Sequence, residues 1–265
     1  MNVRTRVETS RAGSGGCSSP ERPRPVSAPL FFVEAIRPGE SVLLSAEDAR
    51  HAVRSLRLRP GDDLTVADGR GALAVGRLEV DHRGQASVEV YDVRRVPRPS
   101  PRLTVAMAPP KGDRLAWAVQ KLAEVGADEV VLVRAERAIR QWEGERNERA
   151  LARVRAVARE AAMQSRRPFV MSVGSVAQLG DVLAPAAGRV VMLWEDATEP
   201  LRHVLPPNRD VTLLVGPEGG FTDAEVDAGR GSGAAVASLG SGILRTETAA
   251  LVGATLVLAS FGRLG

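Results

Sequence analysis

From residue 103 onward, short apolar runs alternate with segments of helical periodicity, and this alternation constrains the fold more than any other feature of the sequence. The runs LTVAMA (103–108), DEVVLVRA (128–135) and VTLLVG (211–216) have the length and branched composition of buried strands. Between the first two lies RLAWAVQKLAEVG (114–126), an amphipathic stretch that ends in glycine. Strands alternating with helices predict an α/β domain with a parallel sheet over residues 103–265.

The same region contains further candidate elements. We expect additional strands at FVMSV (169–173) and RVVMLWE (189–195), a long helix at 147–165, and a last helix from about Thr246 to Phe261. In open α/β sheets, ligands bind beyond the carboxyl ends of the strands. Loops that follow these strands are therefore the first place to look for a functional site.

Residues 29–96 have a different pattern, with five or six short runs rich in branched residues and separated by Gly, Pro and Asp. One or two helical turns at AEDARHAVRSL (46–56) interrupt them, and the whole predicts a small β-barrel. The Pro-rich stretch 97–102 is the expected linker between the two domains. Residues 1–28, with five Arg against two Glu and few apolar residues, predict a disordered tail.

That tail has other interpretations. It could be a basic arm that contacts RNA, a product of a start site assigned too early, or a weak transit peptide.

Two glycine-rich loops stand out in the second half of the chain. In LLVGPEGGFTDAEVD (213–227) an apolar run enters Gly-Pro-Glu-Gly-Gly, and Thr222 with Glu225 then forms a predicted capping box. In ASLGSGILRTETAAL (237–251) another short run, expected to end at Leu239-Gly240, passes through glycines into a helix. A third candidate is Leu193-Trp194-Glu195, at the end of its strand. Three neighbouring strand ends would form a pocket for an adenosine-like ligand, contacted mainly through the backbone.

The loops lack the signatures of the common phosphate binders. A P-loop needs GxxxxGK[ST], but Phe221 follows Gly220, and no GxGxxG opens a helix here. Glu218 would repel a polyphosphate and favours a cationic or neutral ligand. On this segment alone, a plain tight turn between a strand and a helix remains an equal alternative.

Composition excludes several classes of protein. The single cysteine, Cys17, cannot form a disulfide framework, and the three histidines lack the spacing of metal ligands, so no metal is expected. No apolar stretch reaches the length of a membrane span, and no signal peptide is evident, which favours a cytoplasmic protein.

Arginine clusters, rather than net charge, indicate a nucleic-acid partner. The formal net charge of +4 is concentrated near the N-terminus, and residues 103–265 are neutral overall. Residues 134–167 nevertheless hold ten Arg against five acidic residues, and a second arginine group spans residues 50–59. With 3% aromatic residues, extensive base stacking is not expected. Solvated helix faces are the alternative explanation for such clusters.

The paired segments GPEGGFTDAEV and LGSGILRTETA resemble the RsmE family of SPOUT methyltransferases. Supporting similarity lies in HAVRSLRLRPGDDLTVADGRG, PPKGDRLAWAVQKLAEVGA, ERAIRQW and REAAMQSRR, so the resemblance covers nearly the whole chain after residue 28. It implies a PUA-like β-barrel that binds RNA over residues 29–96, and a SPOUT α/β domain with a trefoil knot over residues 103–265. It also implies a homodimer.

The activity implied by the resemblance is S-adenosylmethionine-dependent methylation of N3 of one uridine, uracil 1498 of 16S ribosomal RNA in the small ribosomal subunit. The enzyme must align the two reactants and assist loss of the N3 proton, without a metal. Arg245 is the expected catalytic cation that stabilises the developing imidate, unless it merely pairs with Glu247. Glu247 is expected either to act as the base or to orient Arg245.

The remaining expected site residues form two sets. The residues assigned to the cofactor are Leu193, Glu195, Gly216, Pro217, Glu218, Gly219, Gly220, Leu239, Gly240, Ile243, Leu244 and Thr248. Those assigned to RNA are Arg50, Arg54, Arg57, Arg59, Lys111, Arg137, Arg166 and Arg167. The rival functions are methylation of another RNA base or a ribose, and a non-catalytic role in ribosome assembly.

Overall fold

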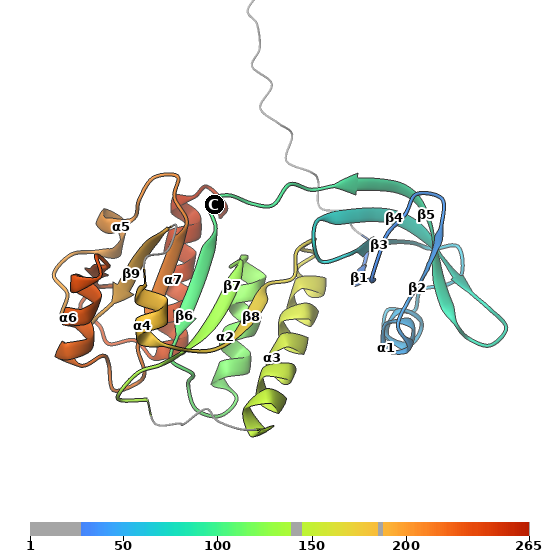
Figure 1. The fold of residues 1–265 in the computed structure, drawn as a ribbon. Coiled ribbons are helices and arrows are strands. Elements are labelled where there is room, and N and C mark those ends of the chain that lie inside the picture. The colour runs from blue at the N-terminus through green and yellow to red at the C-terminus, as the bar shows by residue number, and fades with distance from the viewer. Residues whose placement is uncertain (1–27, 139–144, 185–187, 265) are drawn as a thin grey trace, which may run out of the picture.

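The computed structural model describes residues 28–138, 145–184 and 188–264, which are built on two separate sheets (Figure 1). We call the part built on the five-stranded sheet the N-terminal domain and the part built on the six-stranded sheet the C-terminal domain. The predicted disordered tail lies, up to residue 27, outside the described residues. The described helices include none with the length and apolar character of a membrane span.

The N-terminal domain contains the short strands that the sequence predicts, in the order β1-β3-β4-β5-β2. Neighbouring strands are antiparallel, except that β1 runs parallel to β3. Between β2 and β3 lies helix α1, which continues directly into a π-helical turn, η1. The bounds are β1 Leu30–Phe32, β2 Ser41–Leu43, α1 Ala46–Arg50, η1 His51–Ser55, β3 Asp63–Ala67, β4 Ala72–Val80 and β5 Ala86–Arg95.

The C-terminal domain confirms the predicted parallel α/β architecture. Its strands pair in the order β11-β9-β10-β6-β7-β8, and all of these pairs are parallel. The strand bounds are β6 Leu103–Met107, β7 Glu129–Arg134, β8 Ser172–Gln178, β9 Arg189–Leu193, β10 Val211–Val215 and β11 Ala235–Ala237. The helix bounds are α2 Arg114–Val125, α3 Glu145–Gln164, α4 Leu179–Leu183, α5 Leu201–Val204, α6 Asp223–Gly231 and α7 Thr246–Ser260.

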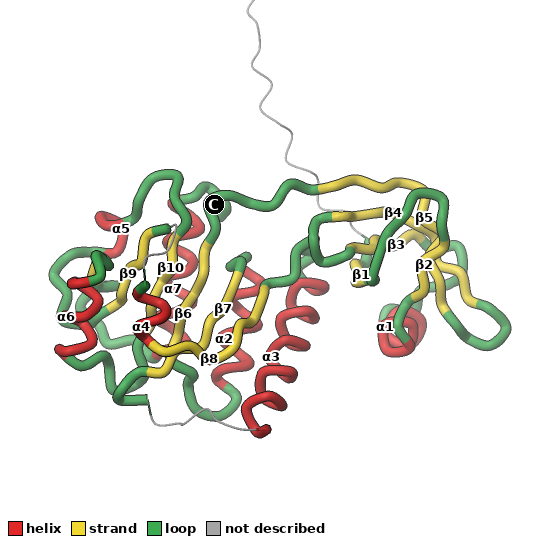
Figure 2. The backbone as a smooth tube through the Cα atoms, in the orientation of Figure 1, coloured by secondary structure: helices red, strands yellow, loops and turns green. Residues whose placement is uncertain are grey.

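Helices cover both faces of this sheet (Figure 2). On one face, residues of α2, α3 and α7 pack with Leu103, Val105 and Leu213 in one apolar core. On the other face, α4 and α6 pack with Met192 and Leu214 in a second core. A sheet covered on both sides exposes only its strand ends and edges, so ligand sites must form there.

Two strand predictions differ from the structure. The strand expected at residues 169–173 begins at Ser172, because Phe169 and Val170 pair with Arg70 and Gly69 of the N-terminal domain instead. The strand expected to end at Leu239-Gly240 already ends at Ala237, so these two residues belong to the loop. The predicted last helix, from Thr246, is confirmed.

Candidate functional site

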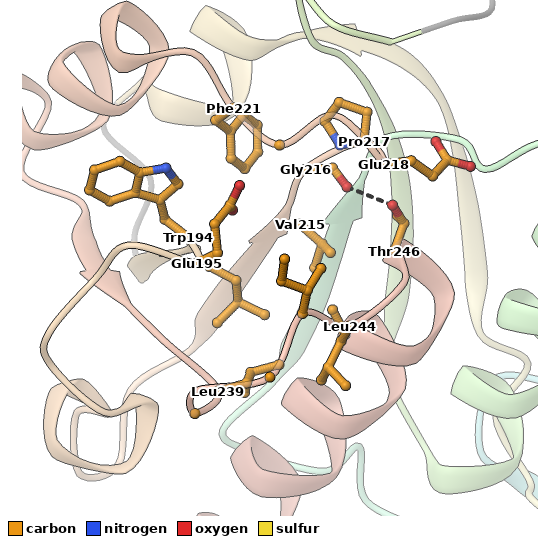
Figure 3. Close-up of a pocket in the computed structure, with 16 residues that line it drawn as sticks. Trp194, Glu195, Val215, Gly216, Pro217, Glu218, Phe221, Leu239, Leu244 and Thr246 are labelled. Carbon is orange, nitrogen blue, oxygen red and sulfur yellow. Dashed lines mark hydrogen bonds between the residues drawn. The ribbon is translucent and has the colours of Figure 1, made fainter.

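The three strand ends singled out in the sequence are neighbours in space. Strands β11, β9 and β10 lie side by side, and their carboxyl ends reach Ala237, Leu193 and Val215. The loops that follow them line one open cavity (Figure 3). Its walls combine main chain from the glycine loops with apolar side chains and two carboxylates. This is the composition expected for a small organic ligand with a polar end.

The cavity residues agree closely with the predicted cofactor set. Ten of the twelve residues line the cavity, whereas Gly219 and Thr248 do not. The other six lining residues lie within the segments that the sequence singled out but were not assigned to the cofactor: Trp194, Val215, Phe221, Gly242, Thr246 and Ala249.

A hydrogen bond joins the two glycine loops. The Thr246 hydroxyl, at the first turn of α7, donates to the carbonyl oxygen of Gly216 at 3.0 Å (Figure 3). Thr246 is buried, so little water competes for this bond. The bond fixes the start of α7 against the Gly-Pro-Glu-Gly-Gly loop.

The backbone conformation at position 220 favours glycine, and the Glu195 carboxylate lies close to it. Its φ is +71°, and an added Cβ would lie 2.5 Å from Oε1 of Glu195. Its N–H donates to the carbonyl oxygen of Pro217 at 2.9 Å, which closes the turn. A Cβ here would displace the Glu195 carboxylate from the loop, and the positive φ would strain any residue that has a side chain.

The predicted capping box of α6 is confirmed and supports the same loop. Glu225 accepts from the Thr222 N–H at 2.9 Å, and the Glu225 N–H donates to the Thr222 hydroxyl at 3.2 Å. The other Glu225 oxygen accepts from the N–H of Glu136 at 2.8 Å. Arg137, predicted to contact RNA, has a role that the sequence did not reveal, because its guanidinium donates to the carbonyl oxygen of Gly219 at 3.0 Å.

One wall of the cavity is apolar although it lies at the surface. Ile243 is 90% exposed and Leu244 is 38% exposed, and both line the cavity together with Leu193 and Leu239. In a cavity wall, such side chains are available to contact an apolar part of a ligand. They offer the flat apolar surface that the sequence predicts for a planar ring.

The two predicted catalytic residues are not paired with each other. Glu247 is buried, and its Oε1 lies 3.6 Å from Nε of Arg114, at the start of α2. Arg114 also lies 4.0 Å from the Glu218 carboxylate, so it bridges the two loops. Arg245 is exposed, does not line the cavity, and has no polar side-chain partner within the described part of the chain. The alternative interpretation, in which Arg245 merely pairs with Glu247, is not what the structure shows: Glu247 pairs with Arg114 instead. The sequence could not indicate this partner because α2 lies far away along the chain.

Glu247 also has an oxygen without a partner. Its Oε2 is buried and has no hydrogen-bond partner among the described residues. A buried carboxylate oxygen without a donor is unfavourable, so the Arg114 charge is what stabilises this group.

Most of the predicted RNA-contacting residues are exposed. Arg50, Arg54, Arg57 and Arg59 are all exposed on the segment that begins in α1, and Lys111 is exposed before α2. We call residues 50–59 the basic segment. Arg166 is also exposed.

Arg167, by contrast, is partly buried. Its Nε donates to the carbonyl oxygen of Glu124 at 2.9 Å, at the end of α2. Burial lowers the pKa of the Arg167 guanidinium, and the positive charge of Arg263 lowers it further. This residue stabilises the C-terminal domain rather than offering its charge at the surface.

The described residues contain no group of three or more His, Cys, Asp or Glu that could hold a metal ion.

Comparison with known proteins gives the class. The family described as RNA methyltransferase domain matches residues 97–258, which include the whole cavity. The family described as RNA methyltransferase PUA domain matches residues 44–91, within the N-terminal domain. The protein is thus an RNA methyltransferase.

Individual relatives narrow the class. The chain is 36% identical over 245 residues to the ribosomal RNA small subunit methyltransferase E of Mycobacterium bovis, covering 88% of this chain and 93% of that protein. The crystal structure of the enzyme of that name from Neisseria gonorrhoeae, bound to S-adenosylmethionine, superimposes with a TM-score of 0.79 at 28% identity, covering 88% of this chain and 97% of that chain. A Legionella pneumophila methyltransferase in complex with bound S-adenosylmethionine gives a TM-score of 0.76 at 28% identity, covering 88% and 98%. The chain belongs to the ribosomal RNA small subunit methyltransferase E family.

The bridge made by Arg114 gives a stability prediction. Arg114→Met leaves the buried Glu247 carboxylate without a cation, and we expect a loss of about 1–2 kcal/mol in the free energy of unfolding. This is below the roughly 3–5 kcal/mol of a fully buried pair, because solvent reaches the partly exposed Arg114 and screens the interaction. Urea denaturation measures the difference.

Arg153→Met is the matched control. Arg153 lies 3.2 Å from Asp113, which is 89% exposed, so its removal should cost less than about 0.5 kcal/mol. Equal losses in the two variants would contradict a structural role for the Arg114–Glu247 pair.

Proposed function

We propose that this protein transfers the methyl group of S-adenosylmethionine to N3 of one uridine, uracil 1498 of 16S ribosomal RNA in the small ribosomal subunit. The observation that carries the proposal is the meeting of the GPEGG and GILRTET loops at three adjacent parallel strand ends, around one cavity. Membership of the methyltransferase E family supports the RNA substrate. The particular uridine rests on the resemblance of the motifs.

The cavity residues fit S-adenosylmethionine. Leu239, Ile243 and Leu244 would pack on the adenine ring, and main-chain groups of Gly216, Pro217, Gly220 and Gly240 would surround the ligand. Glu195 and Glu218 would favour its positive groups. When bound, the cofactor supplies an electrophilic methyl group on a cationic sulfur. Because Gly219 and Thr248 lie outside the cavity lining, we do not include them in this set.

Arg245 is the proposed catalytic cation. The N3 atom of uridine becomes nucleophilic only when its proton leaves, and a guanidinium stabilises the negative charge that develops on the neighbouring oxygens. Arg245 is exposed and lies between Leu244 and Thr246, which both line the cavity. The burial of Glu247 and its pairing with Arg114 favour a positioning role for Glu247 over the role of base.

RNA would be held mainly by the N-terminal domain. We propose that residues 29–96 form a PUA-like RNA-binding domain, joined by the linker 97–102 to the methyltransferase domain at 103–265. The exposed guanidinium groups of the basic segment, together with Lys111, would contact phosphates. Such contacts fix the position of the RNA without reading its sequence, so the choice of uridine would depend on the shape of the RNA.

We infer a homodimer with a knotted C-terminal domain, acting in the cytoplasm where ribosomal subunits are assembled. Helix α7 is apolar almost all round, and it leaves Val252 and Leu256 exposed, while Trp117 is exposed on the adjoining α2. A partner subunit would cover such side chains. The knot is proposed from the resemblance of the two glycine-rich segments to those of SPOUT methyltransferases.

A methyl-transfer assay tests the function. Small ribosomal subunits from a strain lacking this gene are incubated with the protein and tritiated S-adenosylmethionine, and nucleosides are then separated. We expect label in 3-methyluridine at a single position. Label in another nucleoside would keep the enzyme and replace the target, and absence of label together with absence of cofactor binding would indicate an assembly factor.

Substitution of Arg245 tests the catalytic assignment. Arg245→Met should lower kcat by about 10²–10³-fold, as removal of a charge-stabilising donor does, with little change in the Kd of S-adenosylmethionine. Arg209→Met is the control, because Arg209 is exposed at the opposite end of β10, just before Val211. An unchanged kcat in the Arg245 variant would remove this residue from the mechanism.

Substitution of Gly220 tests the cofactor pocket. Gly220→Ala places a methyl group against Glu195 at positive φ, so we expect the Kd of S-adenosylmethionine to rise at least tenfold in calorimetry. Gly231→Ala is the control, because Gly231 ends helix α6 with open space around its Cα and no positive φ. Equal affinities in the two variants would contradict the proposed role of this loop.

A further inference from the structure

An ion pair crosses from one domain to the other. Nη2 of Arg159, on α3 of the C-terminal domain, lies 2.8 Å from Oδ2 of Asp48, on α1 of the N-terminal domain. The same nitrogen donates to the carbonyl oxygen of Phe32 at 3.2 Å, and the guanidinium lies 5.6 Å from the centre of the Phe32 ring. Figure 1 shows α3 as the helix of its domain that faces the N-terminal sheet.

The ion pair affects the orientation of the domains because one of its partners, Asp48, is buried. The Asp48 side chain is 4% exposed, whereas that of Arg159 is 38% exposed. Oδ2 of Asp48 also accepts from the Ser45 hydroxyl at 2.9 Å, and the same hydroxyl oxygen accepts from the Asp48 N–H at 3.0 Å. A buried carboxylate needs a cation, and here that cation comes from the other domain. Separation or rotation of the domains would leave Asp48 uncompensated.

The rest of the domain contact combines apolar packing with main-chain pairing. Leu30, Phe32, Ala67 and Leu73 of the N-terminal domain form one cluster with Ala162 of α3. Beside it, the N–H of Val170 donates to the carbonyl oxygen of Gly69 at 3.2 Å. Apolar packing is not directional, whereas a charged hydrogen bond with a stacked guanidinium specifies one orientation. Arg159 therefore adds a charged, directional contact to the main-chain pairing of Phe169 and Val170 with the N-terminal domain.

The ion pair lies next to the groups proposed to hold RNA. Asp48 is two residues before Arg50, and α1 continues into η1 without a break, so Asp48 and the start of the basic segment move as one rigid helical unit. On the other side, α3 packs on α2, and Arg114 at the start of α2 contacts Glu218 and Glu247 of the cavity loops. The ion pair thus joins two rigid parts, one carrying the basic segment and the other the cavity.

We propose that Arg159 is a positioning residue for the methyl-transfer reaction. Through Asp48 it holds the basic segment in one orientation relative to the C-terminal domain, so that RNA bound by this segment presents its target nucleotide correctly. Arg159 itself touches neither the cavity nor the basic segment. This inference rests on the proposed function, since it concerns the RNA substrate of the same site.

The test separates RNA binding from cofactor binding. Arg159→Met keeps the packing on Phe32 but removes the charge, and Asp48→Asn removes the charge from the other side. We expect each variant of the full-length protein to raise KM for unmethylated small subunits about tenfold, with the Kd of S-adenosylmethionine within twofold of the wild-type value. Because both changes break one interaction, the double variant should be no worse than the more impaired single variant.

Arg155→Met is the matched control. Arg155 lies one turn earlier on α3, and its Nε donates to the carbonyl oxygen of Val173 at 3.1 Å, within the C-terminal domain. This variant loses a hydrogen bond but no contact between domains. Its KM for subunits should stay within twofold of the wild-type value.

Three outcomes would overturn the inference while the wild-type protein methylates subunits. They are an unchanged KM for subunits in both single variants, an equal rise in the Arg155 variant, and additive effects in the double variant. If Arg159→Met fails to fold, Asp48→Asn, which conserves the shape of the side chain, decides the question by the same measurements. If the wild-type protein transfers no methyl group, it is the proposed function that fails.

Discussion

The hydrogen bond from Thr246 to the carbonyl oxygen of Gly216 is the interaction on which the candidate site depends. It joins the loops that leave the parallel strands β10 and β11, which lie on either side of β9, and it does so at the first turn of α7. The pairing of β11, β9 and β10 brings these loops to the same edge of the sheet. The two joined loops and the end of β9 line the cavity, and Arg245 lies directly before Thr246, so its position also depends on this arrangement.

Charged side chains then fix the loops from outside the cavity. Arg114 lies between Glu218 and Glu247, and Arg137 donates to the carbonyl oxygen of Gly219. Each of these arginines comes from a different strand–helix unit than the loop it holds. Such cross-connections are worth more than isolated surface pairs, because one partner is buried or is a main-chain group with a fixed direction. They hold the site in shape before any ligand binds, which lowers the entropic cost of binding.

Local sequence patterns predicted much of this structure because the features they predict depend on residues that lie close together in the chain. The capping box of Thr222 and Glu225 needs only four consecutive residues, and α2 ends at Gly126 because that glycine adopts φ of +98°. The strand β8 was placed too early because Phe169 and Val170 have strand-like side chains but bond to the N-terminal domain. A count of charges along the sequence could not show that the guanidinium groups of Arg137 and Arg167 donate to the main-chain carbonyl oxygens of Gly219 and Glu124.

The sequence by itself determined the alternation of strands and helices, the two glycine loops and most of the residues that line the cavity. These depend on periodicity, on backbone freedom and on motifs that are contiguous in the chain. Only the tertiary structure decided which cations meet which carboxylates. Arg114 pairs with Glu247 across 133 positions of sequence and Arg159 with Asp48 across 111, and such partners are chosen by sheet order and domain packing. No local pattern encodes that choice, because any of the 34 arginines has the same chemistry until the fold places it.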